Sequence, residues 1–259
     1  MVKMNWKNLA IGVLLIIAVA EFAVIWTFLM LPSQKTFNVL VVGTPSESIR
    51  SSLYSEQFKL AGINVIGIVS DSQVSKPMLE KADIVLMQGE EYCDNTVNLF
   101  YDIARRPYSP SSPSIKTKVI AIGNACSRSQ RSSTVGFTAL LFDGNQPPLF
   151  PLSDKPVESR QVNARFQIWD NNNPIFNAIL NQDFSGNVFV YDQIPKPYVI
   201  AYFVEGSFSS EQLIRGDYEG IPAIVQIDLL PNTFVYFSFE PSTLGPSGNY
   251  GLFLNALTS

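Results

Sequence analysis

The chain has 259 residues, of which 46% are hydrophobic and only 15% charged, and its net charge is −4. This hydrophobic content excludes a disordered chain, and an acidic chain without a long basic run is a poor candidate for nucleic-acid binding. The sequence contains no histidine, so it lacks the commonest general base and the commonest metal ligand. Its two cysteines cannot form a four-ligand zinc site alone. We therefore expect no metal and no other cofactor.

Residues 9–31 (LAIGVLLIIAVAEFAVIWTFLML) predict a transmembrane helix, because they form one apolar run with Glu21 as its only charge. Residues 1–8 would be a cytoplasmic tail and residues 32–36 a linker. More positive charge precedes the run than follows it, which places the rest of the chain outside the cytoplasm. A signal peptide cleaved after residues 18–20 (AVA) is the alternative. Cleavage there would leave an apolar new terminus, so an uncleaved signal anchor is favoured.

Glu21 lies near the middle of the predicted span. A carboxylate at that depth costs on the order of 2–3 kcal/mol or more, and it usually faces a partner or is protonated. Two interpretations stay open: Glu21 contacts another membrane-protein subunit, or it is a tolerated, protonated residue.

Residues 37–259 predict one α/β domain. Short apolar runs that end in glycine or polar residues are typical of strands buried on both faces of a parallel sheet. They alternate with helical segments, which favours a doubly wound, mainly parallel, flavodoxin-like sheet. In this first half the expected strands are 37–43, 63–69, 83–89 and 118–123, and the expected helices are 48–62, 77–81 and 94–105.

The second half predicts extra late strands. Residues 162–168 alternate apolar and polar side chains, so this strand has one wet face. Further strands are expected at 188–191, 198–204, 223–228 and 234–239, and a closing helix at 250–257. Residues 144–156 form a proline-rich excursion.

Residues 119–127 (VIAIGNACS) present Cys126 on a tight turn after a buried strand, as a nucleophile elbow does. With residues 83–89 and the segments at 173–179, 220–225, 234–241 and 252–257, this turn resembles the class I glutamine amidotransferase-like fold. The resemblance is nearest to its non-catalytic branch, which includes ThuA-like and β-galactosidase trimerisation domains.

The chain departs from the catalytic pattern that this resemblance implies. Glutaminases of this fold use Cys, His and Glu, and Phe239 stands where the histidine belongs, before Glu240 and Pro241. A cysteine near its ordinary pKa of ~8.5 is mostly protonated at neutral pH without a base. We therefore expect no enzyme. A thiolate at Cys126, stabilised by a helix N-terminus and nearby arginines, would instead predict a redox role.

The sequence favours a membrane-anchored, non-catalytic accessory or scaffolding subunit that binds other membrane-protein subunits. The alternative is a module that binds or senses a small solute in a cleft near Thr44, Glu90 and Cys126. Two polar segments have simpler interpretations: residues 44–48 as a helix cap and residues 170–174 as a turn.

Cys93 and Cys126 are predicted to form a disulfide. Each follows one of two strands that would be neighbours in a doubly wound sheet and would end at the same edge. They are the only cysteines in the chain, and an extracytoplasmic domain lies where disulfides persist.

Overall fold

The computed structural model describes residues 35–96, 98–99, 117–125, 158–190, 198–205, 220–229, 232–244 and 249–259. The chain divides into two compact units, Met1–Lys35 and Thr36–Ser259. The predicted tail, the predicted transmembrane helix with Glu21, and residues 32–34 of the linker lie outside the described residues. Among the residues that are described, no helix is both long and apolar enough to cross a membrane.

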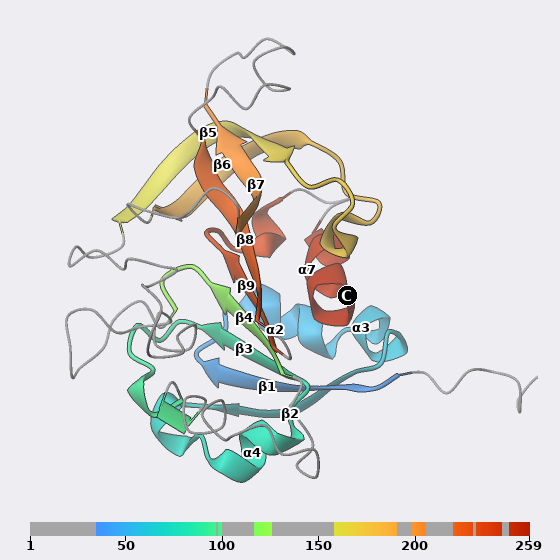
Figure 1. Ribbon diagram of the computed structural model, residues 1–259, viewed down its shortest axis with the longest axis vertical. Helices are drawn as coiled ribbons and strands as arrows, with labels where there is room; N and C mark the ends of the chain where they lie inside the picture. The colour runs from blue at the N-terminus through green and yellow to red at the C-terminus, as the bar shows by residue number, and fades with distance from the viewer. Residues whose placement is uncertain are drawn as a thin grey trace, which may run out of the picture. The chain divides into compact units, whose positions relative to one another are not determined.

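Nine strands of the described part form one mixed sheet in the order β2-β1-β3-β4-β9-β8-β7-β5-β6 (Figure 1). Their bounds are β1 Phe37–Gly43, β2 Ile63–Val69, β3 Ile84–Gln88, β4 Lys118–Ile122, β5 Glu158–Ile168, β6 Gln182–Val190, β7 Val199–Val204, β8 Ile221–Leu229 and β9 Asn232–Phe237. Each strand predicted from the sequence overlaps one of these observed strands.

The sheet is half parallel, not mainly parallel as the sequence suggested. The strands from β2 to β9 in the sheet order are parallel neighbours, and those from β9 to β6 are antiparallel neighbours. One reason is local: β8 and β9 are joined by residues 230–231 alone, and a hairpin this short permits only antiparallel pairing. The apolar content of each strand gave no information on its direction.

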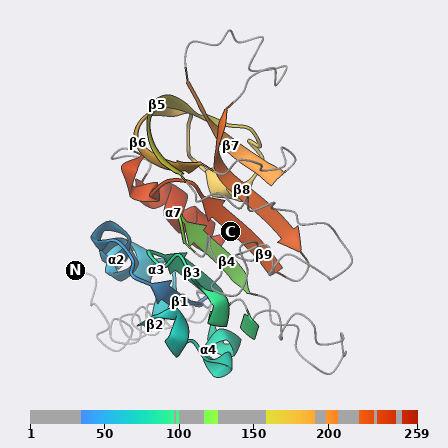
Figure 2. The same cartoon turned by 90° about the vertical axis from the view of Figure 1, so that its left-hand side faces the viewer.

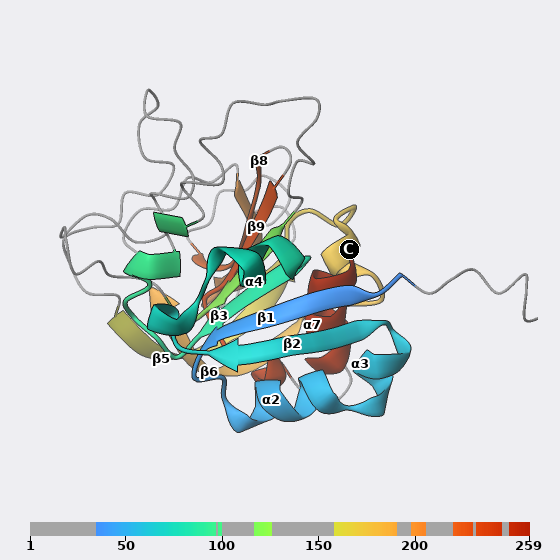
Figure 3. The same ribbon diagram turned by 90° about the horizontal axis from the view of Figure 1, so that it is seen from below.

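Helices lie on both faces of the parallel half (Figure 3). They are α2 Glu47–Tyr54, α3 Glu56–Leu60, α4 Lys76–Lys81 and α7 Asn249–Thr258. The helix predicted over 48–62 is two helices. Ser55 has extended backbone angles (φ −66°, ψ 154°), ends α2 and accepts the Phe58 N–H at the start of α3.

Alternate residues of β1 belong to two separate cores. Val39 and Val41 pack with α2, α3 and α7, whereas Leu40 and Val42 pack on the α4 face. All four side chains are essentially inaccessible to solvent, which explains why this strand reads as a continuous apolar run.

The antiparallel half of the sheet is bent (Figures 1 and 2), and a cluster of phenylalanines packs in this part of the core. Phe184 of β6 stacks on Phe203 of β7 with ring centroids 4.2 Å apart. Phe239 contacts both rings edge-on, at 5.5 Å and 5.1 Å. The bend also brings the end of β6 next to the end of β9. There the Phe189 N–H donates to the Ser238 carbonyl at 2.7 Å.

Candidate functional site

In doubly wound sheets ligands bind beyond the carboxyl ends of the parallel strands. The loops at this edge carry every cleft residue predicted from the sequence: Thr44 follows β1, Glu90 follows β3, and Cys126 follows β4. Thr44 and Glu90 are described, and Cys126 lies outside the described residues.

The loops after β1 and β3 touch through their backbones, where the strand order reverses. Gly43 and Gly89 have positive φ (98° and 75°). A Cβ added to Gly43 would lie 2.3 Å from the Gln88 carbonyl oxygen, and one added to Gly89 would lie 2.3 Å from the Thr44 carbonyl oxygen. The Thr44 N–H donates to the Gln88 carbonyl at 2.9 Å. Thr44 thus supports the loop after β3, and it is not among the residues that line the pocket described below.

The segment 44–48 is a helix cap, as predicted. Ser46 is the N-cap of α2, and its Oγ accepts the Ile49 N–H at 3.2 Å. The same hydroxyl donates to Glu240 Oε1 at 2.7 Å, and the Ser242 hydroxyl donates to that oxygen at the same distance. Glu240 thus ties the loop after β9 to the start of α2.

The turn after β4 is covered on two sides. The Tyr236 hydroxyl donates to the Gly123 carbonyl at 2.9 Å. A Cβ at Gly123 (φ 68°) would lie only 2.8 Å from the Phe189 ring. Ala125 is fully buried. The described part of the predicted elbow is therefore packed under an aromatic ring contributed by β6.

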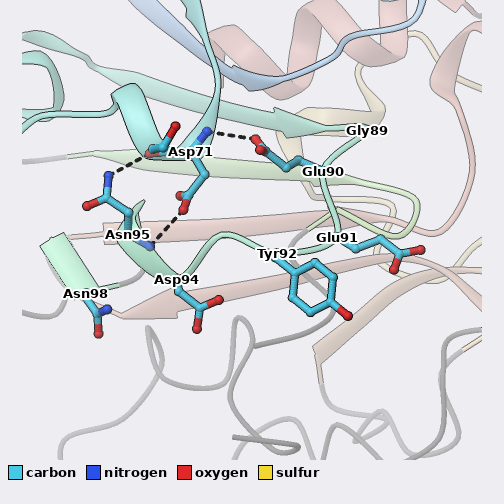
Figure 4. A pocket seen from close by; sticks show the side chains of 9 residues that line it. Asp71, Gly89, Glu90, Glu91, Tyr92, Asp94, Asn95 and Asn98 are labelled. Carbon is cyan, nitrogen blue, oxygen red and sulfur yellow. Dashed lines mark hydrogen bonds between the residues drawn. The ribbon is translucent and has the colours of Figure 1, made fainter. Parts of the chain in front are cut away.

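A pocket of about 620 Å³ lies beside this edge, next to the ends of β2 and β3 (Figure 4). Glu90, one of the three cleft residues suggested by the sequence, is among the residues that line it. The other lining residues are Asp71, Ser72, Gly89, Glu91, Tyr92, Asp94, Asn95 and Asn98. The described part of the lining contains four carboxylates and no lysine or arginine.

Three of these carboxylates accept hydrogen bonds from nearby backbone N–H groups or from a side-chain amide. Asp71 accepts the Asn95 and Thr96 N–H groups at 2.9 Å and 2.8 Å. Glu90 accepts the Asp71 N–H at 2.9 Å, and Glu91 accepts the Asn124 side-chain amide at 3.0 Å. Within the described ranges, no group of three or more His, Cys, Asp or Glu residues could hold a metal ion.

Sequence reasoning missed Asp71 and Asn95, which join the loop after β2 to the loop after β3. The Asn95 amide donates to the carbonyls of Asp71 and Val74 at 2.7 Å and 2.9 Å. An acidic residue just beyond the end of a predicted strand was the available signal for Asp71. Nothing in the sequence pointed to Phe189, because its contact with Gly123 depends on the bend of β6.

The polar segment 170–174 is a turn, as predicted. Asp170 Oδ1 accepts the Asn172 N–H at 3.2 Å, and Asn173 Oδ1 accepts the Ile175 N–H at 3.1 Å.

Cys93 is 1% exposed and disulfide-bonded. Cys126 is the only other cysteine of the sequence. Because Cys126 lies outside the described residues, the Cys93–Cys126 pairing remains a prediction.

The chain matches no protein-family model, and it matches no curated protein sequence.

Proposed function

We propose that this chain is a membrane-anchored, extracytoplasmic, non-catalytic domain of glutamine amidotransferase-like type. It would act as an accessory or scaffolding subunit that binds a partner protein in a membrane or cell-envelope complex. The observation that carries the proposal is the environment of Phe239. Its side chain is fully buried among phenylalanine rings, and in the sequence resemblance Phe239 stands in place of the histidine base of glutaminases.

The turn after β4 supports a non-catalytic role. A nucleophile elbow needs open space above its turn for the substrate carbonyl. The Phe189 ring occupies the space next to Gly123, and the whole sequence offers no histidine to deprotonate a thiol. A single missing triad member lowers the rate by several orders of magnitude, since the members act as a unit.

A direct assay tests this part of the proposal. We expect the purified full chain to release no more ammonia from glutamine than a Cys126→Ala variant does. Release by the unmodified chain that the variant lacks would contradict the non-catalytic role.

The bonded state of Cys93 supports the extracytoplasmic location, because disulfides persist in oxidising compartments. Protease added to sealed cells should digest the domain from residue 37 onward. Full protection would place the domain in the cytoplasm.

Co-purification tests the partner. The full chain, isolated from solubilised membranes of its own cells, should retain a second polypeptide in fixed proportion. A Glu21→Leu variant should insert normally and retain about threefold less of that chain, since polar contacts between membrane helices average about 0.6 kcal/mol. If the chain retains no other polypeptide, the accessory role is wrong.

A second candidate function, binding of a small solute, is favoured by the pocket near Glu90. Its volume suits a small ligand, and its carboxylates would select a cationic or neutral polar one. Native mass spectrometry of the detergent-extracted chain separates the two functions: a retained small molecule supports this one, and a retained polypeptide supports the first. We rank it second because Asp71, Glu90 and Glu91 already accept internal hydrogen bonds.

A further inference from the structure

β6 is the last strand of the sheet, so among the described residues only one side of its backbone has a neighbouring strand. It pairs with β5 through nine consecutive positions without a bulge. Along an antiparallel strand, alternate residues direct their N–H and C=O groups toward the neighbour and away from it. The Ile168 N–H of β5 donates toward β6, to Asn181 Oδ1, whereas the Phe189 N–H of β6 donates away from β5, to Ser238. Odd-numbered residues of β6 therefore direct their backbone groups outward.

This outward edge is open over Asp183, Ser185 and Asn187. All three residues are exposed. Among the described residues, their N–H groups meet no acceptor beyond β6, whereas that of Phe189 is bonded to Ser238.

Proteins usually protect a sheet edge with a bulge, a proline or a lysine. The opposite edge strand, β2, is interrupted by a register shift at residue 66. β6 has neither a bulge nor a proline nor a lysine. Among the described residues, this edge of the sheet is therefore able to accept another strand.

We propose that β6 pairs with β6 of a second copy of this chain, antiparallel and centred on Ser185. In this arrangement Ser185 lies opposite Ser185 of the partner subunit, and Asp183 lies opposite Asn187 of the partner subunit. Each of these three pairs exchanges two backbone hydrogen bonds, which gives about six in all. The two copies together form one continuous sheet, a contact that is independent of the accessory role proposed above.

Among the registers centred on an outward-directed residue of β6, polar complementarity between the two copies favours this one. Each Asp183 carboxylate faces an asparagine amide that can donate to it, and no like charges are opposed. Centring the pair on Asp183 would place two carboxylates opposite each other. Centring it on Asn187 would require the Phe189 backbone, which already bonds to Ser238.

A cysteine placed at the centre tests the contact in the full chain, in detergent. Residues of a hydrogen-bonded antiparallel pair have Cα atoms about 5.5 Å apart, within the range of a disulfide. Ser185→Cys should therefore form a reducible dimer under mild oxidation. Asn163→Cys is the matched control, since Asn163 pairs with Ser185 but lies one strand inside the sheet. It should form no disulfide-linked dimer. A monomeric Ser185→Cys chain, equal cross-linking of both variants, or cross-linking of Ser185→Cys to a different polypeptide would each overturn the proposal.

A charge exchange provides a second test that changes only exposed side chains. Asn187→Asp opposes two carboxylates twice in the dimer, so the dimer dissociation constant, measured by light scattering, should rise about tenfold. Adding Asp183→Asn restores the complementary pairs and should restore the original dissociation constant. The proposal fails if Asn187→Asp leaves dimerisation unchanged, or if the double variant dimerises as weakly as the single one.

Discussion

Ala178 carries backbone strain. It is the only described non-glycine residue with a positive φ, at 61°, and it lies exposed between Phe176 and Ile179, which are both buried. A side chain in the left-handed region costs about 1–2 kcal/mol, whereas glycine there has no such penalty. The burial of its two neighbours holds the turn in this conformation.

We expect Ala178→Gly to raise the free energy of unfolding by about 0.5–1 kcal/mol, because the relieved strain exceeds the added entropy of the unfolded chain. Ala61→Gly is the control, since Ala61 has an ordinary φ of −80°. It should lower stability by about 0.5–1 kcal/mol. Urea unfolding of both variants measures the difference, and an equal loss in both would show that Ala178 is not strained.

Phe239 is a structural residue whatever its evolutionary origin. Its ring contacts Phe166, Phe184, Phe203 and Phe237 and is fully buried. Removing a buried phenylalanine leaves a cavity and typically costs 3–5 kcal/mol, roughly.

Phe239→Ala should therefore lower the free energy of unfolding by about 3–5 kcal/mol. Tyr54→Ala, which truncates an aromatic side chain that is 49% exposed, should change it by less than about 0.5 kcal/mol. Thermal unfolding in detergent compares the two variants. Similar midpoints would mean that the cavity left at Phe239 is filled by its neighbours.

At the scale of elements, α7 is held by a cation from the sheet. The Lys118 ammonium of β4 donates to the Ala256 carbonyl at 3.0 Å, and it also donates to the Ser259 carbonyl and hydroxyl. The last carbonyls of a helix lack partners within it, and a positive charge there also interacts favourably with the helix dipole.

We expect Lys118→Met, which keeps the aliphatic stem, to cost about 1–2 kcal/mol and to speed amide exchange in α7. Lys76→Met is the matched control. Lys76 has a side chain that is 38% exposed and lies 3.9 Å from Glu80, so its loss should cost less than about 0.5 kcal/mol. Equal exchange rates in α7 for the two variants would contradict the role of Lys118.

Sequence patterns predicted elements well where the pattern had one physical cause. β1 was predicted at its observed bounds, because a strand buried on both faces must be apolar throughout. The helix over 48–62 was predicted as one piece, because the cap at Ser55 interrupts a continuous helical pattern. β6 was placed only at its C-terminal end, since its early residues alternate with exposed polar side chains.

At the scale of the whole molecule, the sequence predicted which edge of the sheet carries the candidate site. It did not predict that a side chain from β6 covers the turn after β4 at this edge. Strand order follows from the apolar strands of the first half, which locate Thr44 and Glu90 at one edge. The bend of the antiparallel half brings Phe189 from β6 onto Gly123 of the neighbouring turn. Contacts between residues so far apart in sequence depend on strand direction and curvature, which local patterns do not encode.

The disulfide is a whole-molecule prediction, because it joins the ends of two neighbouring strands. β3 and β4 are parallel neighbours, and Gln88 at the end of one lies in register with Ile122 at the end of the other. Cys93 and Cys126 follow these two residues closely in sequence, and Cys93 is disulfide-bonded. We therefore expect a Cys93–Cys126 bond that encloses the segment between the two strands.

Without reductant, the unfolded chain should resist alkylation at both cysteines and run as a monomer on a denaturing gel. After reduction, intact mass should show two alkylated positions. Loop-closure arithmetic gives about 3–4 kcal/mol of stabilisation for a loop of this length, so a Cys93→Ala/Cys126→Ala variant should unfold at lower urea concentration by a corresponding amount. A disulfide-linked dimer would mean that the two cysteines pair between chains. Two alkylated cysteines without reductant would exclude the bond and restore the alternative of a reactive Cys126 with a redox role, because a thiol beside a helix N-terminus can ionise.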